Sequence, residues 1–130
     1  MTPELVALTL AAILQSAQIL LAGAAMNRDA GFAYNASPRD APAELSPLTG
    51  RLRRAVANHF EALALFTVAV MVVTLSGKAS GLTAICAWVY LAARVLYVPA
   101  YAFGWSPWRS AIFAVGATAT MVMLLAALIA

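Results

Sequence analysis

The chain has 130 residues, of which 64% are hydrophobic and only 10% are charged, whereas an ordinary soluble domain is about 45–50% apolar and about 25% charged. A soluble helical bundle is excluded, because the chain lacks the polar residues that its outer faces would need. We expect an all-α integral membrane protein, a single four-helix domain over residues 1–130. The net charge of +3 is mostly arginine in one loop, which bears on topology and anionic ligands and not on nucleic acid.

The first predicted span covers residues 4–26, long enough for a full crossing, which takes about 20 residues. It is not typical of a signal peptide, because the residues before the apolar run include Glu4 and contain no Lys or Arg. Gln15 and Gln18 lie near its middle and share one helical face. We favour hydrogen bonds between helices as their role. The alternative is that they line a shared cavity.

A polar segment, residues 27–53, follows the first span. It mixes acidic and basic residues with Pro38, Pro42 and Pro47, and this composition disfavours a regular helix over most of its length. We expect a loop over residues 27–51 that is either a solvated connector or a cover over a site.

Three further spans are predicted over residues 52–75, 82–103 and 108–129. The last one follows a turn in which Ser106 is the expected cap and Pro107 the first helical residue. The single cysteine, Cys86, excludes an intrachain disulfide and a multi-cysteine metal site. We expect no metal, and we interpret Cys86 as a packing residue near the outer end of its helix.

Basic residues are concentrated on one side of the predicted membrane. The second loop carries only Lys78, and the third carries Arg109 at its edge. The first loop and its helix junction carry Arg28, Arg39, Arg51, Arg53 and Arg54. The positive-inside rule therefore places the first and third loops in the cytoplasm and both termini outside it.

Two predicted spans carry a polar face inside the membrane, and we call the two faces together the polar ladder. In the second span its members, at offsets of four and three, are Arg54, Asn58 and Glu61. In the third span they are Arg94, Tyr97 and Tyr101. Offsets of three and four place side chains on one helical face.

The depths of the two polar faces can be compared, because the two spans run in opposite directions. At about 1.5 Å per residue, Glu61 and Arg94 each lie about 13 Å in from the cytoplasmic ends of their spans. A carboxylate at that depth is costly and rarely faces lipid, so we expect Glu61 and Arg94 to form the deepest pair, within salt-bridge or one-water distance of each other. The same arithmetic places Asn58 at the depth of Tyr97 and Arg54 at the depth of Tyr101, so we expect the two polar faces to meet inside the bundle.

The cytoplasmic end of the polar ladder has more arginines than are needed to neutralise Glu61. Arg54 and Arg109 lie there, with Arg51 and Arg53 close by. A ladder alone is equally compatible with a structural role, since buried polar pairs can fix helix register without chemistry. The surplus of positive charge favours a site for an anion with several carboxylates.

These residues carry a family resemblance. Residues 54–61 read RAVANHFE and resemble the R-A-x-x-N-x-x-E pattern of the MAPEG family, the membrane-associated proteins of eicosanoid and glutathione metabolism. Arg94 to Tyr97, with Tyr101, resembles the second conserved block of that family, and residues 108–110 resemble its third. Residues 27–29, Asn-Arg-Asp, are similar to the short bacterial members.

The resemblance implies a homotrimer in a bacterial inner membrane, with glutathione as cosubstrate at subunit interfaces facing the cytoplasm. It implies transferase or peroxidase activity on apolar electrophiles or lipid hydroperoxides. The residues implied to hold glutathione are Arg54, Asn58, Glu61, Arg94, Tyr97 and Tyr101. Arg109 would lie near the sulfur, with Ser110 beside it. A nearby guanidinium favours the thiolate over the thiol.

Two departures from the family pattern leave it open whether the chain is an enzyme. Ala57 stands where the eicosanoid-making branch has a further arginine, and Phe113 stands where several members have a tyrosine. The alternative is a catalytically silent subunit of a larger membrane complex. A small multidrug transporter is disfavoured, because Glu4 is too near the end of its span to serve as a proton site. His59 lies off the ladder face, and we interpret it as an interfacial packing residue.

The charge distribution makes a topological prediction. A reporter that is active only in the cytoplasm should be inactive when fused after Ala130, because the arginine-rich loops stay in the cytoplasm and place both termini outside. The same reporter inserted between residues 40 and 41 should be active. Activity of the fusion at Ala130 would contradict the predicted orientation.

Overall fold

The computed structural model describes residues 1–130 and contains four long helices, one short helix and no strand. The helices are α1 (Pro3–Ala30), α2 (Phe32–Ala36), α3 (Pro47–Leu75), α4 (Gly81–Ala102) and α5 (Trp108–Ile129). Each of the four long helices is long and apolar enough to cross a membrane. The expected all-α fold with four membrane helices is confirmed.

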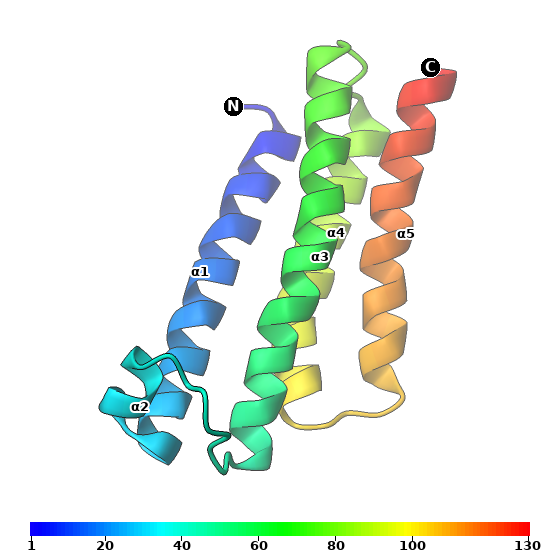
Figure 1. Ribbon diagram of the computed structural model, residues 1–130. Coiled ribbons are helices and arrows are strands. Elements are labelled where there is room, and N and C mark those ends of the chain that lie inside the picture. Colours follow the sequence, from blue (N-terminus) through cyan, green and yellow to red (C-terminus); the bar gives the residue numbers. More distant parts are fainter.

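The four long helices form a bundle with α3 and α4 at its centre (Figure 1). Both α1 and α5 pack against these two helices, and they do not contact each other. Both termini lie at one end of the bundle, and α2 lies at the other. We call the end that carries α2 and the turn between α4 and α5 the basic end.

Side-chain caps mark the starts of three long helices. Thr2 and Ser46 each accept a hydrogen bond from the backbone N–H three residues on, and Ser80 and Thr83 form a reciprocal capping box. Each cap satisfies a backbone donor that the first helical turn leaves without a partner.

Two helices extend further into the polar segment than the sequence predicts. The first runs on to Ala30 and ends at Gly31, whose φ of +89° suits glycine. The second begins at Pro47 and not at Leu52, because proline is tolerated at the first helical position, where its missing N–H would have no partner. The prediction of irregular structure over most of residues 27–53 is therefore wrong, and it holds for residues 37–46.

The first loop is held against the bundle by polar contacts. The Asp29 carboxylate accepts a hydrogen bond from the Ser46 N–H at 2.8 Å and pairs with Arg28 at 3.0 Å. Arg28 in turn donates to the hydroxyls of Ser46 and Thr49. These contacts join the last turn of α1 to the first turn of α3.

The start of α5 also differs from the prediction. The helix begins at Trp108, and Ser106 does not cap it. The Arg109 N–H instead donates to the Trp105 carbonyl at 2.8 Å. A backbone turn thus takes the place of the expected side-chain cap and sets the position of Arg109.

The main core is built largely from small residues. It contains six of the buried alanines, Ala7, Ala11, Ala69, Ala87, Ala119 and Ala127. Small residues let helix backbones approach closely, which is how helices associate where lipid is as apolar as the side chains. The Phe66 and Tyr90 rings stack within this core at 3.9 Å. Cys86 packs there too, as predicted.

One buried acid lies at the end opposite the basic end. Glu4 is 1% exposed and accepts a hydrogen bond from the Thr83 hydroxyl at 2.8 Å. This contact joins the first turn of α1 to the first turn of α4. Glu4 therefore lies at one end of the bundle, and the polar ladder lies toward the other end.

The contact between α4 and α5 makes a packing prediction. A Cβ on Gly116 would lie 3.6 Å from the Ala93 Cβ and 3.7 Å from the Tyr90 ring, which is ordinary van der Waals contact. Gly116→Ala should therefore be tolerated, and Gly116→Leu should destabilise the bundle by about 1–3 kcal/mol through overpacking. Unfolding of the purified protein by SDS would measure both, and equal midpoints for the two variants would refute the prediction.

Candidate functional site

Tyr101 is the centre of the polar ladder at the basic end. Its hydroxyl oxygen accepts a hydrogen bond from Arg54 Nε at 3.1 Å. The Arg109 guanidinium carbon lies 4.9 Å from the centroid of the Tyr101 ring, and that of Arg54 lies 5.9 Å from it. A cation within about 6 Å of an aromatic centroid is attracted by the ring. The expected pairing of Arg54 with Tyr101 is therefore present, and Arg109 joins it.

A small cavity of about 200 Å³ lies beside Tyr101, and we call it the three-arginine cavity. Its charged lining residues are Arg51, Arg54 and Arg109, and Gly104 and Ser106 complete the wall. Arg51 donates to the Ala102 carbonyl at 3.4 Å. None of the three arginines is paired with a carboxylate, since the one ion pair in the chain joins Arg28 to Asp29. The cavity is therefore suited to an anion.

Arg51 and Ser106 join this cavity although neither was predicted as a site residue. Arg51 lies three residues before Arg54 on α3, and this spacing places both on one face. That signal was present in the sequence, but it depends on α3 beginning at Pro47. Ser106 lies in the turn before α5, where it was expected as a helix cap and not as part of a cavity.

Arg94 is the deepest member of the ladder. It is 2% exposed and donates from Nη1 to the Asn58 Oδ1 at 3.0 Å. Its guanidinium carbon lies 4.2 Å from the centroid of the Tyr97 ring, and the Tyr97 ring meets that of Tyr101 edge to face at 5.6 Å. The ladder is thus continuous from Arg94 to the three-arginine cavity.

The direct ion pair that was one form of the predicted Glu61–Arg94 contact is absent, and the other form, a contact through one water, stays a prediction. Glu61 is exposed and forms no ion pair, and Arg94 is bonded to Asn58, one turn nearer the basic end. Asn58 and Tyr97, which we expected at the same depth, both contact the Arg94 guanidinium. The Arg94 side chain is long and extends along apolar surface toward the membrane boundary, so its charged end lies nearer the basic end than its place in the sequence indicates.

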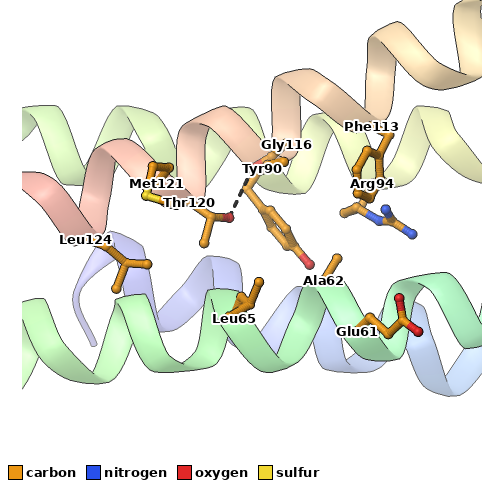
Figure 2. A pocket seen from close by; sticks show the side chains of 11 residues that line it. Glu61, Ala62, Leu65, Tyr90, Arg94, Phe113, Gly116, Thr120, Met121 and Leu124 are labelled. Atoms are coloured by element: carbon orange, nitrogen blue, oxygen red, sulfur yellow. Dashed lines mark hydrogen bonds between the residues drawn. The ribbon is translucent and has the colours of Figure 1, made fainter.

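Glu61 and Arg94 nevertheless lie at the same end of a second cavity, which we call the apolar cavity. It has a volume of about 260 Å³ and lies between α3, α4 and α5 (Figure 2). Its walls include Leu65, Phe113 and Leu124. An apolar chamber with a polar end is typical of sites for small organic ligands.

Ser110 does not join either cavity. It is exposed on α5, and its hydroxyl forms no hydrogen bond within the chain. Six of the eight predicted site residues are thus connected by contacts. Glu61 lies at the end of the apolar cavity, and Ser110 lies outside both cavities.

Gln15 and Gln18 bond to a neighbouring helix, as predicted. Gln15 Nε2 donates to the Val56 carbonyl at 3.0 Å. The side-chain oxygens of Gln15 and Gln18 lie 3.0 and 2.9 Å from Nδ1 of His59. His59 is fully buried inside the bundle, so the interpretation of this residue as interfacial is wrong.

The observed partner of Arg94 makes a prediction about stability. Asn58→Ala should destabilise the protein by about 1.5–3 kcal/mol, because it removes a hydrogen bond to a buried charged group. Glu61→Gln should not destabilise the protein, because this side chain is exposed and has no ion-pair partner to lose. SDS unfolding without glutathione tests both, and a loss of stability for Glu61→Gln would restore the Glu61–Arg94 pair.

A model of the MAPEG family matches residues 4–129 of the chain. This family includes glutathione-dependent transferases and peroxidases. No curated protein and no solved structure matches the chain. The family match covers all four long helices and both cavities. The chain is therefore an integral membrane protein that belongs to the MAPEG family.

Proposed function

We propose that the protein binds glutathione and activates its thiol for attack on an apolar electrophile or a lipid hydroperoxide. The observation that carries this proposal is the three-arginine cavity, in which Arg51, Arg54 and Arg109 have no acidic partner. Three unpaired guanidinium groups favour a ligand with more than one carboxylate. Glutathione has two carboxylates, an ammonium group and a thiol, and family members use it.

The residues proposed to hold the tripeptide are Arg54, Asn58, Glu61, Arg94, Tyr97 and Tyr101. The arginines supply charge for the two carboxylates. Glu61 is exposed and free of ion pairs, so it is available for the ammonium group. Tyr97 and Tyr101 connect the two ends of the ladder through their rings.

Arg109 is the proposed catalytic residue, with Ser110 beside it on α5. A free thiol has a pKa of about 8.5 and is mostly protonated at neutral pH. A guanidinium near the sulfur stabilises the thiolate, which is the attacking form. The Arg109 side chain is held over the Tyr101 ring, so its charge is positioned before the ligand arrives.

We also propose that the protein is a homotrimer in a bacterial inner membrane, with both termini outside the cytoplasm and the sites at subunit interfaces. The apolar cavity is partly open to the outside of the bundle, and Glu61 at its polar end is exposed. A neighbouring copy packed there would close the cavity and cover a carboxylate that otherwise faces lipid, where it is costly.

Two substitutions within the family pattern favour a second candidate, a catalytically silent subunit of a larger membrane complex. Ala57 is exposed on α3 and offers no polar contact. The Phe113 ring lies 6.4 Å from that of Tyr97, beside the ladder, and lacks a hydroxyl. In this second candidate the ladder serves only to fix the helices.

The proposal predicts that two arginine variants separate kinetically. Arg54→Ala should raise the apparent KM for glutathione roughly 10- to 100-fold, because it removes charged hydrogen bonds made equally before and during reaction. Arg109→Ala should lower kcat roughly 100-fold, because its charge acts on the reacting sulfur. Conjugation of a chloro-nitrobenzene and reduction of a lipid hydroperoxide are the assays.

Lys78→Ala is the matched control, because it removes one positive charge at the end opposite the site. It should leave both constants unchanged. Isothermal titration of glutathione and thiolate absorbance would be measured beside the assays. If the wild type shows no binding at millimolar glutathione and no thiolate signal, the silent subunit replaces the enzyme.

A further inference from the structure

The orientation of the Gln15 amide is fixed independently of His59. Its Nε2 donates to the Val56 carbonyl at 3.0 Å, and a carbonyl oxygen can only accept. The Gln15 Oε1 therefore faces His59. It lies 3.0 Å from Nδ1 of the imidazole, and the Gln18 Oε1 lies 2.9 Å from the same atom.

This arrangement determines the tautomer of His59. Two amide oxygens accept at Nδ1, so Nδ1 carries the proton and Nε2 has a lone pair. His59 is fully buried, and its Nε2 has no hydrogen-bond partner in the chain. The imidazole thus presents an unsatisfied acceptor inside the membrane.

Unsatisfied donors lie close to this acceptor on α4. The Tyr90 ring centroid is 6.4 Å from that of His59, and Arg94 lies one turn further along the same helix face. The Tyr90 hydroxyl and the Nε and Nη2 of Arg94 have no partner in the chain, although both residues are at most 2% exposed. Figure 2 shows the Tyr90 hydroxyl reaching toward α3 near Ala62.

The distribution of these atoms is uneven. Seven buried side-chain polar atoms in the chain lack a partner, and five of them belong to Gln18, His59, Tyr90 and Arg94. A buried polar group without a partner in hydrocarbon costs several kcal/mol. Five such groups in one region, with an acceptor beside several donors, call for a small molecule that both donates and accepts.

We propose that His59, Tyr90 and Arg94 form a buried water-binding site. Water can donate to His59 Nε2, accept from Arg94 and bond to the Tyr90 hydroxyl. This gives it about three partners, the usual number for a buried water. The apolar cavity, which Tyr90 and Arg94 both line, provides the route of entry. The site shares Arg94 with the proposed glutathione site, whereas His59 and Tyr90 belong to the water site alone.

The water has a physical role in holding Arg94. The guanidinium has no carboxylate within ion-pair distance and one hydrogen bond, to Asn58. Water supplies further acceptors and lets the side chain remain charged below the membrane surface. His59 must then stay neutral, since an imidazolium would lose its lone pair and place a second cation beside Arg94.

The chain contains a single histidine, so ¹⁵N-histidine labelling gives one pair of ring signals. In detergent-purified protein we expect the proton on Nδ1, an Nε2 shift typical of an acceptor that receives a hydrogen bond, and magnetisation transfer from water to the ring. A proton on Nε2, or an Nε2 shift typical of a free lone pair, would overturn the proposal. This measurement on the wild type needs no variant.

Tyr90→Phe and Thr74→Val form a matched pair, because each removes a buried hydroxyl that has no partner in the chain. If Tyr90 bonds to water, Tyr90→Phe should lower the unfolding temperature by a few degrees. Thr74 lies about four turns further along α3 than His59. Thr74→Val should leave the unfolding temperature unchanged or raise it, since removing an unsatisfied group is neutral or stabilising.

The same pair distinguishes water from a direct bond between Tyr90 and His59. With water in the site, Nε2 keeps its hydrogen-bonded shift and its water contact in Tyr90→Phe. Loss of both in that variant would show that the tyrosine itself was the donor and would reject the water site. Equal or raised stability of Tyr90→Phe, as for Thr74→Val, would reject it as well.

Discussion

The guanidinium of Arg94 has to be accommodated inside the membrane without a carboxylate. A charged side chain at the centre of a bilayer helix costs about 2.5–3.5 kcal/mol on insertion scales, so its surroundings must solvate it. The Asn58 oxygen on α3 and the Tyr97 ring on α4 do so at 3.0 and 4.2 Å. The need to solvate one charge thereby sets the register of the two central helices.

The basic end follows from the same register. With Asn58 facing Arg94, the next turn of α3 places Arg54 at the Tyr101 hydroxyl, and the turn before α5 brings Arg109 over the same ring. One tyrosine thus gathers cations from two helices. Because no acidic residue neutralises these arginines, the electrostatic potential at this end is positive. A bound anion would neutralise that charge.

The sequence was sufficient for the fold class and for the faces of the ladder, because lipid requires apolar helices and spacings of three and four define a face. It was insufficient for the pairing across helices. Depths counted by residue ignore the reach of the Arg94 side chain, which shifted the contact from Glu61 to Asn58. His59 was correctly placed off the ladder face, but its burial against α1 was not predicted, because its glutamine partners are far away in sequence.

The stacked Phe66 and Tyr90 rings and the alanines around them have an electrical consequence. They fill the bundle between Glu4 at one rim and the polar groups of His59 and Arg94. Protons and ions need a continuous line of polar groups or water, and closely packed apolar side chains interrupt it. Water in the half of the bundle that contains His59 and Arg94 would therefore not make a path for ions or protons across the membrane. A membrane that carries a voltage would not discharge through the bundle.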